Sequence, residues 1–241
     1  MRFNNRDPNW IHPAISVSKE IYPSMPNREI ATAETASGDL VTHVSIRQDE
    51  ATIRMNIAGR TYDEAMDARI TLAGWAGSSH NQTAELEPTH LPGKAYTAIL
   101  KRITPIESRF TTADVIFLLP RPVLHDTTPS KAQAEGTELV FTTRGTHSTQ
   151  PVISIVLDAA ADGLRMEVDG VTFFAIGGSL SAGAKVEYNL QTGATTIDGV
   201  HAENRILFAD IDPDIELLPG KHTLISSAAG TLQARWRNEW L

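Results

Sequence analysis

Short strand patterns separated by turn residues fill the second half of this chain, and they constrain its fold more than any other feature. Asp169 and Gly170 separate an alternating run at 164–168 from an apolar run at 171–176. An Asp-Gly pair between two such runs predicts a β-hairpin, because a type I′ turn needs positive φ at both central residues. Further strands are expected at residues 152–157, 186–190, 195–197, 205–208, 222–226 and 232–236. Since no helical period follows residue 135, the second half is predicted to be an antiparallel β-sandwich.

The first half mixes strands with one helix. Alternation at 52–57 predicts a half-buried strand, and two more strands are expected at 95–103 and 113–119 after a turn at 91–94. Residues 115–119 of the second of these strands are apolar on both faces, so we expect it to be central. A helix is predicted at about 61–76, because Thr61 and Glu64 have the spacing of a capping box. The expected core-facing stripe of this helix consists of Tyr62, Met66, Ile70 and Ala73.

Prolines and polar residues mark the ends of these segments. Four prolines in the first thirty residues indicate an extended arm or short edge strands. The polar segment 125–138 has the composition of a linker. We therefore expect two domains, an N-terminal β-rich domain with one α-helix at 1–135 and a C-terminal β-sandwich at 136–241. The predicted fold class is mainly β.

Composition excludes several classes of function. The net charge is −8, from 29 acidic and 21 basic residues, which disfavours a broad basic face for nucleic acid. The absence of cysteine excludes disulfides, thiolate nucleophiles and cysteine-ligated zinc. The polar N-terminal residues lack the apolar core of a signal peptide, and no apolar run is long enough to cross a bilayer. We therefore expect no membrane partner and synthesis in a cytoplasm.

No recognisable motif predicts catalysis, a cofactor or a metal. Residues 177–181 fail the nucleophile-elbow pattern at its fifth place, and no phosphate-binding glycine motif is present. The eight histidines are scattered, and none forms the metal-binding pair of a zinc protease. Acidic residues cluster at 210–216, but Ile215 and Lys221 occupy the places where a calcium loop needs glycine and glutamate. The prediction is an acidic loop and no enzyme.

Two tryptophans near the C-terminus are candidate contacts for a partner or a glycan. Exposed aromatic rings of a sandwich stack on the apolar faces of sugars. Alternation places Trp236 on the inward face with Leu232 and Ala234, which favours core packing for it. Trp240 is then the better candidate for a partner or glycan contact.

The order of these features resembles the phage distal tail protein family, the tail-tip hub or baseplate ring proteins of siphophages with a galectin-like C-terminal domain. The likeness spans nearly the whole chain through many weak features. The segments that carry it are residues 21–29, 61–64, 91–96, 117–122, 188–190, 197–199, 216–224 and 234–241.

This resemblance implies a structural virion protein at the distal end of the phage tail, made in the bacterial host cytoplasm. It implies a homo-oligomeric ring, usually a hexamer, whose N-terminal domains surround a channel that DNA passes without specific binding. It also implies an N-terminal arm that reaches a neighbouring subunit, and sandwiches that point outward. The implied partners are the tail tube, tape-measure, tail-tip or tail-associated, and receptor-binding proteins. The alternatives are a carbohydrate-binding sandwich used in host adsorption and, third, a wall hydrolase.

Overall fold

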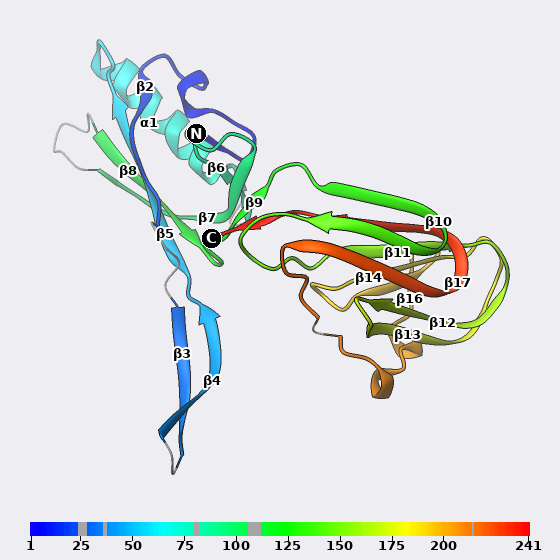
Figure 1. Cartoon of the computed structure of the whole chain (residues 1–241). Helices are drawn as coiled ribbons and strands as arrows, with labels where there is room; N and C mark the ends of the chain where they lie inside the picture. The colour runs from blue at the N-terminus through cyan, green and yellow to red at the C-terminus, as the bar shows by residue number, and fades with distance from the viewer. Residues whose placement is uncertain (24–27, 36–37, 80–81, 106–111, 214) are drawn as a thin grey trace. The chain divides into compact units, whose positions relative to one another are not determined.

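Two compact units make up the protein. The computed structural model describes residues 1–23, 28–35, 38–79, 82–105, 112–213 and 215–241 (Figure 1). Unit 1 consists of Met1–Thr127 with Leu241, and unit 2 consists of Thr128–Trp240. Strands build both units, and the one α-helix among the described residues lies in unit 1. The predicted fold class, mainly β with one helix in the N-terminal part, is confirmed.

An antiparallel sheet is the framework of unit 1. Its strands follow the order β1-β6-β7-β8-β5-β2, and β9 pairs with the start of β7. The central place of β8, between β7 and β5, agrees with the prediction from its apolar residues on both faces. The strands are β1 (Arg2–Phe3), β2 (Ile15–Ile21), β5 (Asp49–Ile57), β6 (Ala84–Glu87), β7 (Lys94–Pro105), β8 (Thr112–Leu119) and β9 (Leu124–Asp126).

A hairpin of β3 (Arg28–Thr35) and β4 (Gly38–Ile46) is inserted between two neighbouring strands of that sheet. β2 and β5 pair as far as Ile21 opposite Thr52, and β3 and β4 pair with each other in a separate two-stranded sheet. Sequence patterns predicted neither strand of the hairpin. Alanine and threonine dominate β3, so it lacks the contrast between apolar and polar positions that marks a half-buried strand.

Helix α1 (Tyr62–Ala76) begins and ends where the sequence predicts. The Thr61 hydroxyl accepts a hydrogen bond from the Glu64 amide at 3.2 Å, and the Glu64 carboxylate accepts one from the Arg60 amide at 2.6 Å. In a standard capping box the Glu64 carboxylate would accept from the Thr61 amide, whereas here it accepts from the amide of the preceding residue, Arg60. Gly77 caps the C-terminus, and η2 (Gly77–Ser79) follows. These contacts satisfy amides that the first turn leaves without helical partners.

The face that α1 buries is not the predicted one. Tyr62 and Ile70 are 73% and 66% exposed, so their expected place in the core is wrong, and Met66 is only half-buried. The side chains that α1 buries are Ala68, Leu72, Trp75 and Ala76. Both stripes of the helix are apolar, and the periodicity of the sequence alone did not identify the one that faces the sheet.

Aromatic packing decides the orientation of α1. The ring of Trp75 lies edge-on to Phe3 and Phe117, with centroid distances of 5.9 and 6.2 Å. Its indole N–H donates to the carbonyl of Arg6 at 3.1 Å, which satisfies the polar atom of a buried tryptophan. This cluster joins β1, β8 and α1 at the centre of the unit 1 core.

Unit 2 is an antiparallel sandwich built on two long strands. β10 (Ser130–Thr143) and β17 (Gly220–Trp236) pair along their whole length and belong to both layers. One layer adds β11, β14, β15 and β16 beside the C-terminal half of β17, and the other adds β12 and β13 beside its N-terminal half. The bounds are β11 (Val152–Leu157), β12 (Ala161–Val168), β13 (Val171–Leu180), β14 (Lys185–Asn189), β15 (Thr195–Ile197) and β16 (Val200–His201).

The layers pack through one apolar core, in which Tyr188 of β14 lies 4.9 Å from Phe174 of β13 between ring centroids. The predicted hairpin of β12 and β13 is present. Asp169 and Gly170 both have positive φ, at 51° and 84°, as a type I′ turn requires. The short strand β18 (Glu239–Trp240) follows β17.

Two expected segments differ from the sequence-based prediction. The boundary between the two units lies within the segment 125–138, after Thr127, but most of this segment is not a linker, because it contributes to β9 of unit 1 and the first half of β10 of unit 2. The expected strand at 205–208 is instead a pair of short 3-10 turns, η3 (Glu203–Arg205) and η4 (Phe208–Asp210). Ile206 forms only an isolated bridge to Ile176 of β13. This segment still covers the edge of β13, which protects that edge from pairing with other chains.

Paired glycines let β10 and β17 pass from one layer to the other. Gly136 and Gly230 lie opposite each other, and the register shifts by a bulge immediately after Gly136. A Cβ atom on Gly230 would lie 2.2 Å from the carbonyl oxygen of Val156. Only glycine fits this position, because the contact is with backbone that cannot move away cheaply.

We therefore expect Gly230→Ala to lower the free energy of unfolding of the protein by about 2–4 kcal/mol. Urea unfolding followed by tryptophan fluorescence measures this change. Gly177→Ala in the same unit is the control, since its Cβ would make only ordinary contact with Leu207 at 3.6 Å. Equal stability losses in the two variants would contradict the role given to Gly230.

Candidate functional site

The N-terminal segment is fastened to unit 1 over its described residues. β1 pairs with β6, η1 (Pro8–Trp10) follows, and β2 pairs with β5. Met1 and Phe3 are buried, with 6% and 0% exposure. Residues 1–23 therefore form the short edge strands that the prolines predicted, and the alternative of an extended arm is wrong for them. Pro26, the last of the four prolines, lies outside the described residues.

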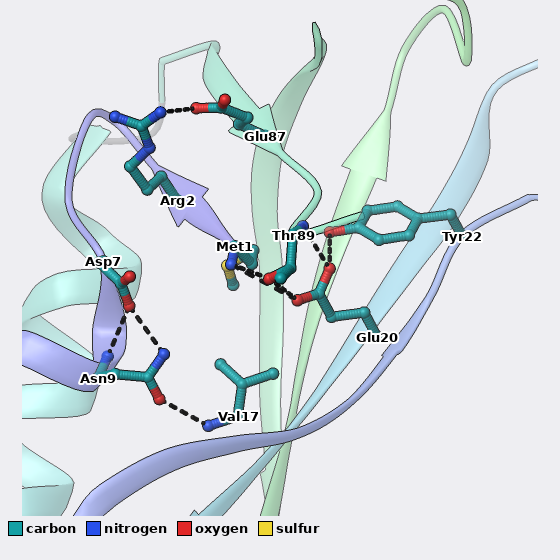
Figure 2. A network of polar contacts seen from close by, with 9 residues as sticks. All are labelled: Met1, Arg2, Asp7, Asn9, Val17, Glu20, Tyr22, Glu87 and Thr89. Atoms are coloured by element: carbon teal, nitrogen blue, oxygen red, sulfur yellow. Dashed lines mark hydrogen bonds and ion pairs between the residues drawn. The ribbon is translucent and has the colours of Figure 1, made fainter. Parts of the chain in front are cut away.

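A polar network holds this segment in place (Figure 2). The Met1 ammonium group donates to the Thr89 hydroxyl and lies 3.5 Å from the Glu20 carboxylate. The same carboxylate accepts hydrogen bonds from the Thr89 hydroxyl at 2.6 Å, the Thr89 amide at 3.1 Å and the Tyr22 hydroxyl at 3.1 Å. Three sequence-distant segments thus meet at one largely buried carboxylate.

The electrostatics of this network favour an ionised Glu20. Burial alone would raise the pKa of Glu20, but the hydrogen bonds from Thr89, the Met1 charge and the Tyr22 hydroxyl together lower it below the ordinary value of 4.5. Burial and the Glu20 charge raise the pKa of Tyr22, so its hydroxyl remains a donor. The network is a charged structural anchor, with no base or nucleophile free to react.

Weaker contacts extend the anchor along the same segment. Arg2 pairs with Glu87 at 2.7 Å (Figure 2). The Asp7 carboxylate caps η1 by accepting from the Asn9 amide at 2.9 Å, and the Asn9 side chain accepts from the Val17 amide at 3.1 Å. These bonds fix the turn between β1 and β2, which carries the 88% exposed Trp10.

One cluster in unit 2 has the composition of a catalytic triad. His222 Nδ1 lies 2.7 Å from the Asp169 carboxylate, and Nε2 lies 3.1 Å from the Thr143 hydroxyl. However, Nε2 also lies 2.8 Å from the Leu218 carbonyl oxygen, to which it donates. Thr143 is 2% exposed and donates to the same carbonyl. His222 Nε2 is therefore not available as a base. The Thr143 hydroxyl is not available as a nucleophile, and the cluster has a structural role at one end of the sandwich.

The two tryptophans differ in their surroundings. Trp236 is 6% exposed, its ring lies 5.0 Å from that of Phe141 between centroids, and its indole N–H donates to Asn238 at 3.0 Å. This is the core packing that alternation favoured. Trp240 is half-buried. A partner or glycan contact through Trp240 stays a prediction.

The acidic cluster at 210–216 begins at the last residue of η4 and continues into the loop before β17. The Glu216 carboxylate accepts from the Ser148 hydroxyl at 2.6 Å, and Asp214 lies outside the described residues. Among the residues that the structure describes, no group of three or more metal-binding side chains converges. Within the same residues, no helix has the length and apolar character of a membrane span.

Comparisons with known proteins show similarity to phage tail proteins. Residues 144–240 match the family described as siphovirus-type tail component, C-terminal domain. The fold of the chain is similar to that of SPP1 Dit (gp 19.1), described as a paradigm of the hub adsorption apparatus in phages infecting Gram-positive bacteria. That match has a TM-score of 0.81 at 14% identity and covers 99% of this chain and 98% of Dit. No curated protein sequence matches the chain significantly.

A second solved structure is similar at a lower level. It is the phage P2 baseplate in its activated conformation with Ca, with a TM-score of 0.50 and 9% identity over 93% of this chain and 90% of that chain. Residues 144–240 are thus similar to a siphovirus tail-component domain, and the fold of the chain is similar to that of Dit. The predicted resemblance to the phage distal tail protein family agrees with both comparisons.

Removal of the anchoring carboxylate tests the N-terminal network. We expect Glu20→Ala to lower the free energy of unfolding by about 2–4 kcal/mol, because it leaves a buried ammonium group without its counter-charge. The pKa of Glu20 is lowered by folding, so its contribution is present above pH 4.5 and is lost as the pH falls through the folded value. Urea unfolding at pH 7 and pH 3 measures both effects.

Arg2→Ala is the control, because the Arg2 side chain is 55% exposed and its ion pair is worth less than about 1 kcal/mol. A Glu20→Ala variant as stable as Arg2→Ala at pH 7 would contradict the anchoring role. So would a stability difference from the wild type that stays constant down to pH 3.

Proposed function

We propose that this protein is a structural subunit of the siphophage tail tip that forms a closed ring, with six copies as the expected number. The ring joins the tail tube to the baseplate and receptor-binding apparatus, and DNA passes through it. The observation that carries this proposal is the fold match over 99% of the chain to a protein described as part of a hub adsorption apparatus. The match to a siphovirus tail-component domain supports it independently.

In this proposal the two parts of the chain have separate roles. The N-terminal part, residues 1–135, forms the ring, and the galectin-like sandwich at 136–241 points outward. The proposed partners are the tail tube, tape-measure, tail-associated and receptor-binding proteins. A net charge of −8 suits a conduit for DNA, because a strongly cationic wall would hold the phosphates back.

The proposed role is structural and not enzymatic. The arrangement most like a catalytic site, around His222 and Asp169, uses its polar atoms for hydrogen bonds within the fold. The anchor at Glu20 is likewise saturated by its partners. Convergent polar atoms in both places stabilise the subunit and leave no group to act on a substrate.

Multi-angle light scattering of the purified protein tests the ring. We expect a mass several times the 26.3 kDa of the chain, with six copies as the predicted number. Closed rings keep a single defined mass as the concentration rises, whereas open chains grow. A mass of one chain at every concentration up to the solubility limit would contradict the proposal.

Carbohydrate binding by unit 2 is the alternative proposal, and it depends on Trp240. Trp236→Ala is unsuitable for a test, because loss of that buried ring would unfold the core. On a glycan array we expect no binding by the wild type. Binding that Trp240→Ala abolishes, with the fold intact by circular dichroism, would establish the alternative.

A further inference from the structure

Strand β10 of unit 2 has a free edge. Over the described part of the chain, β17 is the one strand that pairs with it, on one side only (Figure 1). The backbone N–H and C=O groups on the other side are open to an added strand. Native proteins keep many edge strands short, whereas β10 runs over 14 residues. An edge of this length is a template for pairing with another chain.

The first half of β10 is the part that can accept a straight partner strand. Pro129 precedes β10 and has no amide hydrogen to donate to a neighbour. A bulge follows Gly136, where β10 passes to the other layer. These two features delimit a segment at 130–136, and its midpoint is Gln133.

The inward-facing side chains of this segment are small and incompletely covered. Ala132 and Ala134 are half-buried, whereas Leu139 and Phe141 in the second half of β10 are 2% and 4% exposed. A strand added at 130–136 would cover the two alanines. Burial of their methyl groups would then stabilise the added strand.

The outward-facing residues of the same segment carry opposite charges at its two ends. Lys131, Gln133 and Glu135 are exposed on one face of the sheet. Lys131 lies opposite Arg235 of β17, and neither cation has a carboxylate partner among the described residues. Glu135 accepts from the Thr231 hydroxyl at 2.9 Å, and a carboxylate has further acceptor sites for a cation. The positive end therefore lacks a counter-charge within the chain.

Antiparallel pairing of two copies about Gln133 matches both charged ends at once. Lys131 of each copy then lies opposite Glu135 of the other copy. Directly opposed side chains of an antiparallel pair have Cβ atoms about 4.5–5.5 Å apart, which is close enough for an ion pair. A twofold axis at Lys131 or at Glu135, or parallel pairing in register, would place like charges together. The axis that charge selects is also the midpoint that Pro129 and the bulge define.

We propose that two copies of this chain pair through β10, antiparallel about Gln133, so that their unit 2 sheets become continuous. Main-chain hydrogen bonds between the strands form the contact, and the two pairs of Lys131 with Glu135 select the partner and the register. The contact covers an edge that would otherwise accept other extended chains. A pair of short strands is a small interface, so the association is reversible.

This contact goes beyond the proposed ring. Neighbours in a ring meet through unlike surfaces, whereas the β10 pair uses the same surface of both copies. The pair therefore needs its own test, with a readout that does not depend on the mass of the ring.

A single cysteine at the proposed twofold axis tests the pair in the full-length protein, which has no other cysteine. In Gln133→Cys the two thiols of a pair lie opposite each other, so a short bismaleimide cross-linker should give covalent dimers on a denaturing gel. Thr142→Cys is the control, because this exposed residue of β10 lies beyond the bulge and far from the axis. We expect a dimer yield about tenfold higher at residue 133.

Charge reversal in the Gln133→Cys protein tests the register. Lys131→Glu leaves only carboxylates on the segment and Glu135→Lys leaves only amines, so each should lower the dimer yield about tenfold. An equal mixture of the two variants should recover the yield, because each chain then meets the opposite charges. The double variant Lys131→Glu, Glu135→Lys should recover it without mixing. Circular dichroism checks that all variants fold.

The outcomes separate this inference from the proposed ring. Cross-linking at residue 133 without a closed ring in light scattering leaves the pair standing and contradicts the ring. A ring whose Gln133→Cys variant cross-links no more than Thr142→Cys leaves the proposed function standing and overturns the pair. Yields that do not respond to charge reversal, or that do not recover in the mixture, overturn the antiparallel register. A strand from a different protein would then be the occupant of the β10 edge.

Discussion

The packing of Trp75 against Phe3 and Phe117 determines what unit 1 presents to its surroundings. A helix with two apolar stripes has two ways to lie on a sheet, and the stripe that it does not bury becomes surface. The indole has the larger apolar area and finds a hydrogen-bond acceptor in the Arg6 carbonyl, so its stripe is buried. Tyr62 and Ile70 are exposed as a direct consequence. The core and the exposed apolar surface of unit 1 thus have one cause.

The N-terminal network supports this arrangement from the edge of the sheet. Phe3 can meet Trp75 only while β1 stays paired with β6, and the Met1, Glu20 and Thr89 contacts fix the chain beside that pair (Figure 2). The charged groups Met1 and Glu20 therefore stabilise unit 1 by holding the N-terminal strand in place. In unit 2 the His222 and Asp169 pair has a similar role, because it joins the turn between β12 and β13 to the start of β17. Polar clusters in both units hold strands together.

Local chemistry made much of the fold predictable. The turn at Asp169 and Gly170 and the cap at Thr61 depend on neighbouring residues, and both are present as expected. Contacts between distant residues were not predictable. β10 carries small inward-facing alanines such as Ala132 and Ala134, so its first half has the polar composition of a linker although it pairs with β17. The anchor at Glu20 joins residues 69 positions apart, and no local pattern marks it. The inward face of Trp236 followed from alternation, whereas the outward stripe of α1 needed the tertiary structure.

In the proposed ring, each subunit is completed by other copies of the chain. Tyr62 and Ile70 of α1 are exposed in unit 1, and the buried polar clusters of both units are satisfied by hydrogen bonds within the fold. Electron microscopy of the purified protein at high concentration tests this claim most directly. The expected result is closed rings with rotational symmetry built from the 26.3 kDa chain. A uniform population of single, unassociated subunits would contradict it.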